Sequence, residues 1–579
     1  MKSYITSGLS MLLFSAVATA QNTQNFSASP HAASSFQTGS LAYFDSARAT
    51  WVVNYTGPKS SDDVAELAVD AAGNIYITGE SQNQDNTFDF ITVKYNSSGA
   101  QQWAMRYDFS GRDDNSRAMT IDGAGNVYVT GTSDGGGSIF DIATIKYNSQ
   151  GVQQWLMRYN GSASRSDFGS SVALDNAGNV YVAGSSRVST NSQLNYDIVI
   201  IQYNSSGAQQ RLSSFNHNNP TLGNSDDFAR VMTLDKDDNI YVTGTRDLLN
   251  QVDIVTLKYN SAGVQQWAAF YNGPGLSLDE PAALAVDQSG NVYVAGNSRG
   301  SGTGDDVVLI KYNAAGTEQW IRRYTGSGSN PEDANDMALD AAGNIYVTSS
   351  TNVSGNNNFV TIKYKPNGDQ EWIAFYDSPA RFSDGANALT LDRTDNVYVT
   401  GSSMSRALTT DFLTIKYDGS GKEQWVTRYS GPQKFDVARA IAVDGSNNVM
   451  VTGKSSNTGW TTIKYAQIAT AVQNETTQPP GRFWLSQNYP NPFWSGAKSP
   501  AVGGGNLSTA IRFDLPEASL ATLKIYNLRG EEIATALDEY RPAGSHTINW
   551  TPLGLSNGIY FYRLEAGRFF DVKKIIIAK

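Results

Sequence analysis

The sequence predicts an all-β protein: a β-propeller of eight four-stranded blades closed by the N-terminal strand, followed by a small Ig-like β-sandwich. Two observations predict the propeller. Tryptophans recur at intervals of about fifty residues, and each interval holds four short runs rich in Val, Ile, Thr and Tyr that Gly, Asn and Asp separate. A third observation, a series of alternating apolar and polar segments after residue 484, predicts the sandwich.

The composition limits the classes of function. The 579 residues carry a net charge of -11, which argues against nucleic acid as a partner because phosphates attract a basic surface. The chain has no cysteine and only three histidines, so disulfides and thiolate chemistry are excluded and zinc sites are disfavoured. We expect no cofactor and no resident metal.

The first twenty residues have the features of a secretory signal peptide. Lys2 gives a positive start, residues 9–17 are apolar, and the small residues before Ala20 predict cleavage between Ala20 and Gln21. The apolar run is too short to span a bilayer, and no other stretch approaches that length, so no transmembrane segment is expected in the mature chain. Residues 21–45 are rich in Ser, Ala, Asn and Gln and predict a flexible N-terminal segment.

Each repeat follows one pattern, which predicts strands A, B, C and D. In the first copy these strands lie around residues 67–69, 74–78, 89–95 and 103–107. The fourth residue of the A–B turn is Gly, Asp or Asn in every copy, and these residues best tolerate a left-handed backbone. We therefore expect one tight hairpin per blade. The strand-D tryptophan position is held in turn by Trp51, Trp103, Trp155, Arg211, Trp267, Trp320, Trp372 and Trp425.

The ends of the repeat region predict ring closure. Residues 51–55 form a strand D with no A, B or C before it, whereas the last unit, residues 441–465, has A, B and C but no D. The N-terminal strand can complete the last blade and bury two open edges. The predicted propeller spans residues 46–465.

The repeats resemble the SBBP family of β-propeller repeats, through G-N-x-Y-V-T-G, then D-x-x-T-I-K-Y, then the tryptophan strand, over about residues 51–465. This resemblance implies secretion and a scaffold role, with no known reaction. The family name implies seven blades, whereas eight units can be counted in the sequence, so either the ring is larger than seven blades or one unit lies outside it.

Loop lengths distinguish the two faces of the propeller. The A–B and C–D connections have nearly constant lengths, and all the variation falls on the opposite face, which we call the variable face. Its longest loops are residues 185–196 and 216–226 of the third unit. Since loops carry function on a scaffold, the candidate ligand-binding residues are those in this sector; solvated loops without function remain the alternative. The candidates are Arg187, Asn191, Tyr196, His217, Asn218, Asn219 and Arg246.

Charged residues also recur at equivalent positions of the repeats. An acid lies eight residues before each strand-A aspartate, and we expect it to cap a turn or strand entry; a cation site is the alternative. The strand-C lysines are expected to pair across strands with carboxylates, since a nucleophilic lysine would be singular. The Trp and Tyr series are expected to pack between blades.

Residues 466–483 read as a linker, and residues 484–579 as a separate β-sandwich. The ordered segments N-Y-P-N-P-F, T-A-I-R-F-D-L-P, L-K-I-Y-N-L-R-G and N-G-I-Y-F-Y-R-L resemble the type A sorting domain of the type IX secretion system. That resemblance implies the type IX machinery as a partner, and a protein secreted by or attached to the outer surface of a Gram-negative bacterium.

Two functional hypotheses follow. The first is a non-enzymatic, secreted or cell-surface scaffold that binds a protein or glycan ligand through the variable face. The alternative is a secreted carbohydrate-active enzyme, a lyase or hydrolase, because propellers also host such chemistry and the chain is rich in Asp. No acidic residue on the variable face is visibly singular, which favours the scaffold, and no catalytic residue is assigned.

Overall fold

The structure is a computed structural model, and it divides the chain into two compact units, residues 1–470 and 471–579. The predicted signal peptide, with Ala20 and Gln21, lies outside the described residues. Within these residues, no helix has the length and apolarity needed to span a membrane. The structure describes residues 44–469 and 482–578, except 60, 137–138, 189–194, 220–222, 249–250, 276–277, 327–331, 354–355, 379–381, 406–407, 432–434, 457–458, 489–490, 492, 495–508 and 552–554.

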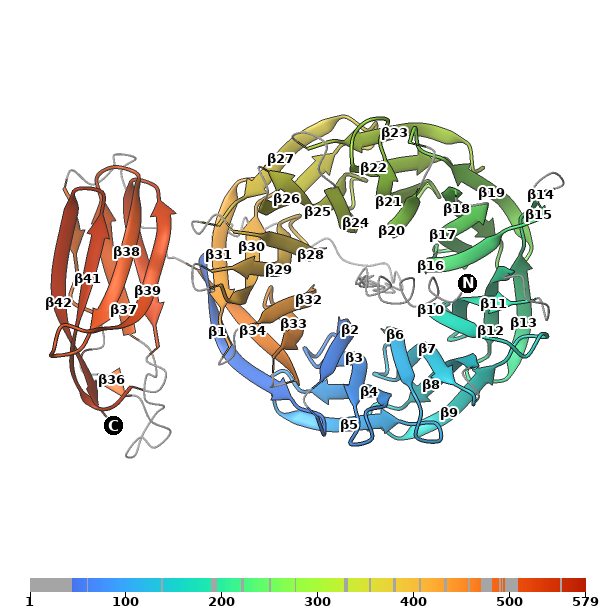
Figure 1. Cartoon of the computed structure of the whole chain (residues 1–579), viewed down its shortest axis with the longest axis horizontal. Coiled ribbons are helices and arrows are strands. Elements are labelled where there is room, and N and C mark those ends of the chain that lie inside the picture. The colour runs from blue at the N-terminus through green and yellow to red at the C-terminus, as the bar shows by residue number, and fades with distance from the viewer. Residues whose placement is uncertain are drawn as a thin grey trace, which may run out of the picture. The chain divides into compact units, whose positions relative to one another are not determined.

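Eight four-stranded antiparallel sheets form the first unit among the described residues, and they are arranged around one ring (Figure 1). Strand A of each blade is innermost and strand D outermost. The count of eight found in the sequence is correct, and all eight units lie within the ring. Strand A starts earlier than expected, at the repeated acid, as in Asp62–Val69.

Blades 1 to 4 contain, from A to D, β2 (Asp62–Val69), β3 (Ile75–Gln82), β4 (Phe88–Tyr95), β5 (Gln101–Tyr107); β6 (Asp114–Ile121), β7 (Val127–Asp134), β8 (Phe140–Tyr147), β9 (Gln153–Tyr159); β10 (Asp167–Leu174), β11 (Val180–Arg187), β12 (Tyr196–Tyr203), β13 (Gln209–Phe215); and β16 (Asp226–Leu234), β17 (Ile240–Leu248), β18 (Gln251–Tyr259), β19 (Gln265–Tyr271). A two-stranded hairpin between blades 3 and 4 contains β14 (Asn218–Asn219) and β15 (Gly223–Asn224).

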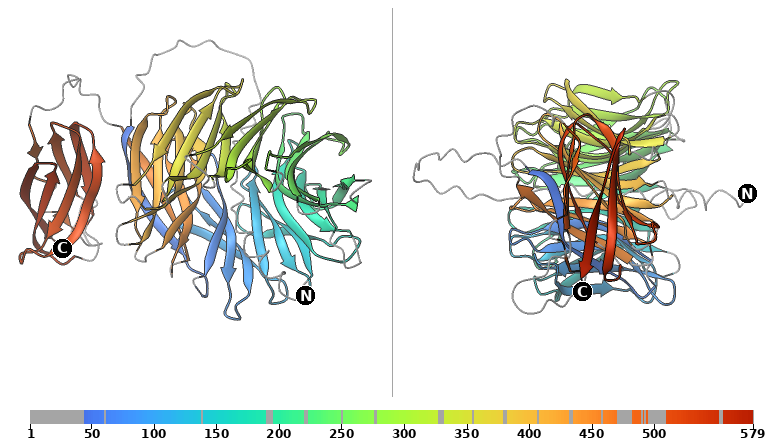
Figure 2. Two further views of the ribbon diagram at one scale, coloured as in Figure 1. Left: turned by 45° about the horizontal axis from the view of Figure 1, so that its top comes forward. Right: turned by 90° about the vertical axis from the view of Figure 1, so that its left-hand side faces the viewer.

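Blades 5 to 8 contain β20 (Asp279–Val286), β21 (Val292–Arg299), β22 (Asp305–Tyr312), β23 (Glu318–Tyr324); β24 (Glu332–Leu339), β25 (Ile345–Val353), β26 (Asn356–Tyr364), β27 (Gln370–Tyr376); β28 (Asp384–Leu391), β29 (Val397–Met404), β30 (Thr410–Tyr417), β31 (Glu423–Tyr429); and β32 (Asp436–Val443), β33 (Val449–Ser455), β34 (Gly459–Ala469), β1 (Phe44–Tyr55). The strands run between the two faces of the ring (Figure 2).

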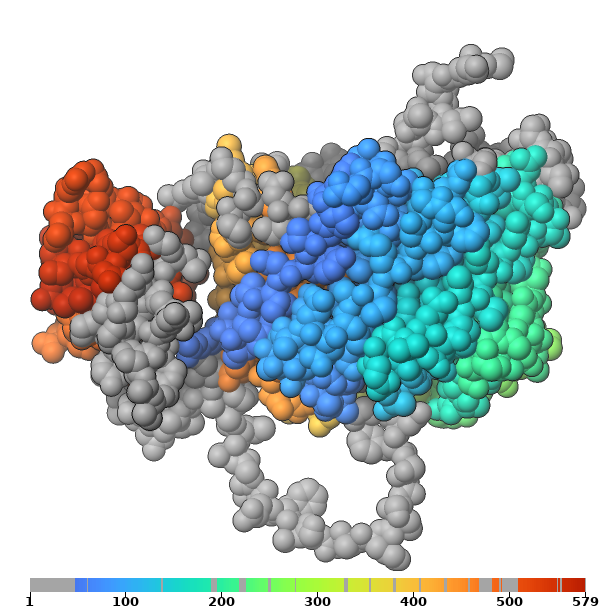
Figure 3. Space-filling view, turned by 90° about the horizontal axis from the view of Figure 1, so that it is seen from below, coloured from blue at the N-terminus to red at the C-terminus, as the bar shows by residue number. Residues whose placement is uncertain are grey.

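The hydrophobic core of the propeller lies between neighbouring blades. Strands B and C are buried along most of their length, because both of their faces are covered. One cluster joins Tyr76, Phe90 and Trp103 of blade 1 to Val127 and Ile145 of blade 2, and equivalent clusters follow around the ring. The blades consequently pack flank against flank, as the space-filling view shows for the N-terminal blades (Figure 3).

The N-terminal strand closes the ring as the sequence predicts. β1 is antiparallel to β34, with Val52 opposite Ile463 and Tyr55 opposite Trp460. The Tyr55 and Trp460 rings lie 4.9 Å apart between their centroids. Trp460 is fully buried in the cluster that joins blade 8 to blade 1, so the first and last strands share one core.

The second unit is a β-sandwich. Its three-stranded sheet contains β35 (Trp484–Leu485), β37 (Thr509–Leu515) and β40 (Gly544–Trp550), and its five-stranded sheet contains β36 (Phe493–Trp494), β42 (Phe569–Ala578), β41 (Gly558–Ala566), β38 (Ser519–Tyr526) and β39 (Glu532–Arg541). The two sheets share one buried core that includes Ile511, Phe513, Leu523 and Tyr562. The Tyr562 hydroxyl donates to the carbonyl of Ser486 at 2.6 Å, which ties the start of the unit to its core.

Candidate functional site

On the face opposite the variable face, which we call the constant face, the repeated strand-A aspartate caps its own A–B turn. Asp70 Oδ1 accepts the backbone N–H groups of Ala72 and Asn74 at 2.9 Å each, and its Oδ2 accepts the Tyr76 hydroxyl at 3.0 Å. This last bond explains the spacing of six between aspartate and tyrosine. Gly73 completes the turn with a φ of 77°, in the left-handed region. These carboxylates are therefore used within the fold.

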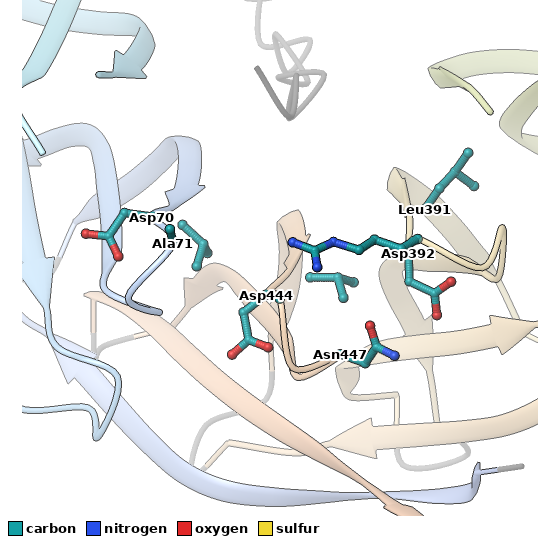
Figure 4. A pocket seen from close by; sticks show the side chains of 10 residues that line it. Asp70, Ala71, Leu391, Asp392, Asp444 and Asn447 are labelled. Atoms are coloured by element: carbon teal, nitrogen blue, oxygen red, sulfur yellow. The ribbon is translucent and has the colours of Figure 1, made fainter. Parts of the chain in front are cut away.

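A shallow hollow of about 90 Å³ lies on this face where the A–B turns of blades 7, 8 and 1 meet (Figure 4). Its wall includes Asp70, Asp392 and Asp444. Each of the latter two accepts bonds from its own turn, such as Asn396 Nδ2 to Asp392 at 2.7 Å. The hollow presents carboxylates that are already hydrogen-bonded, so we assign no ligand to it.

Two of the strand-C lysines, Lys363 and Lys464, form ion pairs with carboxylates, at 3.3 Å from Glu371 and 3.2 Å from Asp444. The predicted pairing is wrong as the common role of the series. Lys94 Nζ lies 4.9 Å from the Tyr76 ring centroid and donates to the carbonyl of Ser149 in the next blade at 3.1 Å. Trp103 Nε1 donates to the same carbonyl at 3.1 Å. Lys and Trp together join blades 1, 2, 4, 5, 6 and 8 to the next blade in this way. Arg211, which replaces Trp in blade 3, keeps this bond by donating to the carbonyl of Ser261 at 2.8 Å.

On the variable face, the repeated acid caps the entry to strand A. Asp114 Oδ2 accepts the N–H of Phe109 at 2.6 Å, and Asp167, Asp279 and Asp384 accept equivalent bonds. This is the capping role expected from the sequence. Asp89, Asp108 and Asp114 bring carboxylate oxygens within 4.8 Å of one another. We assign no metal there, because Arg106 already pairs with Asp89 at 2.6 Å.

A second network connects the strands of a blade near the variable face. In blade 5, Arg323 on strand D pairs with Asp306 on strand C at 2.7 Å and donates to Ser298 Oγ on strand B at 2.7 Å. Blades 1, 2 and 7 have the same three positions. Blades 6 and 8 lack both the arginine and the aspartate, so the charges remain balanced there.

Blades 3 and 4 break this network. Blade 4 has Phe270 in the arginine position and Arg246 in the serine position, so the guanidinium moves to another strand. Blade 3 keeps the acid, Asp197, and the serine, Ser186, but has Ser214 in the arginine position. Asp197 therefore lacks the arginine that balances its equivalents.

Two of the predicted site residues, His217 and Arg246, meet in blade 4. The Arg246 guanidinium pairs with Asp253, lies 4.4 Å from the Phe270 ring centroid and donates to His217 Nε2 at 3.2 Å. The His217 ring lies 4.8 Å from the Phe270 ring. Burial and the nearby guanidinium lower the pKa of His217. Because a guanidinium can only donate, the bond from Arg246 uses His217 Nε2 as its acceptor. Arg246 is largely buried and engaged within the protein.

A carboxyl pair lies beside this group. Burial, with repulsion from Asp227, raises the pKa of Asp197 to about 6, and burial raises the pKa of Asp227 to about 6. Asp227 accepts the N–H of His217 and the hydroxyl of Ser225 at 2.9 Å each. Asn216 Nδ2 donates to Asp197 at 2.8 Å. Both carboxyls thereby hold the loop between strands β13 and β16.

Arg187 and Tyr196 belong to a different group. Arg187 is opposite Tyr196 in the β11–β12 register, and the N–H of Tyr196 donates to Asp226 Oδ1 at 3.1 Å. The Tyr196 ring is buried, with 7% exposure, between Phe168 and Phe228. Tyr196 thus lies within a row of rings and not on a loop tip.

We call this row the aromatic lane: Phe140, Phe168, Tyr196 and Phe228. Successive ring centroids are 6.0, 5.8 and 4.9 Å apart, and successive ring planes are tilted by 36°, 36° and 32°. The three phenylalanines are half-buried. The sequence analysis missed this lane, although aromatic residues at the position before the strand-C aspartate and after the strand-A acid are a visible signal.

The remaining predicted residues are less defined. Asn218 and Asn219 form β14, which pairs with β15 through Asn218 opposite Asn224. Asn191 lies outside the described residues. The structure therefore brings together His217 with Arg246, and Arg187 with Tyr196, as two separate groups on blades 3 and 4.

Comparison with known families agrees with the two units. Residues 102–137, 157–189, 271–302 and 319–356 match the beta-propeller repeat, and residues 500–578 match the secretion system C-terminal sorting domain. The chain carries SBBP repeats and a type IX sorting domain. The sorting domain makes it a protein that is secreted or attached to the outer surface of a Gram-negative bacterium, and implies interaction with the secretion machinery.

Solved structures offer only distant likenesses. An ulvan lyase from a polysaccharide lyase family is 13% identical with a TM-score of 0.40, over 72% of this chain and 96% of that one. PorZ, a surface component of the type IX secretion system of Porphyromonas gingivalis, is 11% identical with a TM-score of 0.29, over 89% and 75%. No curated protein matches the chain in sequence.

Proposed function

We propose that the propeller is a non-enzymatic scaffold that binds an extracellular protein or glycan through the variable face of blades 3 and 4. The observation that carries this proposal is that several departures from the repeat coincide in this sector. There the interstrand arginine is absent from blade 3 and relocated in blade 4, the aromatic lane appears, and the hairpin of β14 and β15 is inserted. An asymmetric ligand needs such a place on a ring of similar blades.

The carboxyl pair is the feature that favours the alternative, a carbohydrate-active enzyme. A pKa near 6 suits a general acid. However, both oxygens of Asp227 accept hydrogen bonds from its own loop, and Asn216 holds Asp197. This arrangement supports a loop anchor more than an acid and base that face a substrate.

The test compares residues at equivalent repeat positions. Arg187 ends β11 of blade 3, and Arg299 ends β21 of blade 5. Wild type, Arg187→Ala/His217→Ala and Arg299→Ala would be measured for binding to a polysaccharide array and to a panel of purified extracellular proteins. We expect the double variant to lose about tenfold in affinity and the blade 5 variant to match wild type. Equal binding by all three proteins would rule out this sector.

The same assay addresses catalysis. Asp197→Asn removes the ionisable group and keeps its size. If a polysaccharide is bound and cleaved by wild type, and cleavage alone is lost in this variant, the enzyme hypothesis replaces the scaffold.

A further inference from the structure

We infer that the ligand of the variable face is a polysaccharide chain, which lies along the aromatic lane; this inference rests on the proposed function and names its ligand class. The lane crosses two blade junctions, because Phe140 is on β8 of blade 2, Phe168 and Tyr196 are on β10 and β12 of blade 3, and Phe228 is on β16 of blade 4. These strands follow one another around the ring (Figure 1).

The lane is not required by the propeller fold. The Trp and Tyr residues that join blades recur around the ring, whereas the lane positions are aromatic in only part of it. The position of Phe168 is held elsewhere by Asp63, Asn115, Glu280, Asp333, Gly385 and Val437. None of the four lane residues belongs to the hydrophobic clusters found between the described parts of the blades.

The position of the rings places them at one face of the protein. Phe140 and Tyr196 are the first residues of their C strands, and Phe168 is the second residue of its A strand, so all three lie where B–C loops and D–A loops meet. The phenylalanines keep part of their surface exposed. The three phenylalanines, spaced along the row with the buried Tyr196 ring between Phe168 and Phe228, offer partly exposed apolar surface at one face.

The surroundings of the lane distinguish a glycan from a protein partner. Charged groups lie next to it in the sequence and register: Arg187 is opposite Tyr196 in the β11–β12 pairing, and Asp226 accepts the N–H of Tyr196 at 3.1 Å. Arg230, two residues beyond Phe228 on β16, pairs with Glu280 at 3.3 Å. A stable protein interface needs about 800 Å² per partner with an apolar centre. A narrow row of rings between polar groups suits a linear chain whose C–H faces stack on rings and whose hydroxyls meet charged groups.

The experiment removes the aromatic faces while keeping apolar bulk. Phe168→Leu/Phe228→Leu is the lane variant. Phe88→Leu is its matched control, because Phe88 is a half-buried phenylalanine at the start of strand C in blade 1, outside the lane. Full-length proteins would be titrated with the polysaccharides that bind wild type on an array of neutral and acidic chains, and thermal unfolding would be recorded for each.

We expect the lane variant to bind its polysaccharide about tenfold more weakly, with a midpoint of unfolding close to that of the control. Unchanged polysaccharide affinity in the lane variant would overturn the lane as the binding site. If wild type binds no polysaccharide but binds a purified protein, and Arg187→Ala/His217→Ala loses that binding, the glycan inference fails while the proposed function stands. If neither class of ligand responds to either set of variants, both fail.

Discussion

Replacing Glu66 by Gln tests the packing between the inner strands. Glu66 lies on β2, at a position where seven other blades have Ala118, Ser171, Val231, Ala283, Asp336, Ala388 and Ala440. Its carboxylate accepts the N–H of Met119 from blade 2. Burial raises the pKa of Glu66 to about 8, and the bond from Met119 offsets only part of that rise. The folded propeller therefore holds this carboxyl group in its neutral form at pH 7.

The sign of the pH dependence follows from the direction of the shift. A carboxyl group with a raised pKa in the folded state binds its proton more tightly there than in the unfolded chain, whose pKa is near 4.5. The stabilisation is complete below pH 4.5 and is lost as the pH rises toward 8. At about 1.4 kcal/mol per pKa unit, the free energy of unfolding of wild type falls by about 4 kcal/mol by pH 8 and by less than about 1 kcal/mol by pH 5.

Glu66→Gln keeps the size and the acceptor for Met119 but cannot ionise. The variant should gain about 3.5 kcal/mol over wild type between pH 5 and pH 8. With an unfolding entropy of about 2 cal/mol/K per residue, a propeller of about 400 residues converts this gain into roughly 4 °C of Tm. Asp336, buried at the same position in blade 6, also has a strongly raised pKa, so Asp336→Asn should act in the same direction.

The assay is thermal unfolding of the full-length protein by calorimetry at pH 5, 6, 7 and 8. Glu318→Gln serves as the control, because Glu318 is an exposed residue on β23. The difference in Tm between wild type and Glu66→Gln should widen with pH, whereas the control should follow wild type. Parallel curves for all three proteins would show that the Glu66 carboxyl group remains ionised and solvated, and would refute the reasoning.

Two further predictions concern the ends of the propeller and of the chain. Deleting residues 49–56 removes the pairing of β1 with β34 and the packing of Trp51, Val53 and Tyr55, and should lower the free energy of unfolding by about 5 to 10 kcal/mol. The control Val52→Ser changes an exposed site of β1 and should leave Tm unchanged. An unaltered Tm in the deletion variant would contradict closure by β1. A chain truncated after Thr477 lacks the sorting domain and should accumulate in the periplasm when cell fractions are immunoblotted; normal surface display of the truncated chain would contradict an export role for that domain.

The sequence was sufficient for the eight blades and their closure because the signals are local and repeated. Each hairpin has its own turn residues, and the missing strands at Trp51 and after Tyr465 complement each other. The partners of the lysines were not predictable in this way. Lys94 reaches the carbonyl of Ser149, fifty-five residues away in another blade, and no pattern within one repeat specifies that contact.

The sequence located the sector where the repeat changes but not the contacts made there, and the role of this sector in binding stays a prediction. The sequence analysis gave Arg246 a binding role, whereas in the structure Arg246 pairs with Asp253. It thereby replaces the strand-D arginine, whose position Phe270 holds in this blade, and this exchange is visible only once both repeat positions are aligned. Tyr196 was predicted to act as an exposed loop residue, whereas its ring is buried between Phe168 and Phe228. These contacts join residues of different blades, and their signal in the sequence is the presence of aromatic residues at two repeat positions.

The join between β1 and β34 also determines the order in which the propeller can be completed. Thr50 on β1 donates to the carbonyl of Lys464, 414 residues later in the chain. A chain that emerges from its N-terminus holds β1 without a partner until the last three strands have been made, and the apolar flanks of blades 1 and 7 that pack on blade 8 stay uncovered for that time. The segment that closes the ring, Gly459–Ala469, is followed by the sorting domain. The strand that completes the propeller and the sorting domain are therefore synthesised one directly after the other.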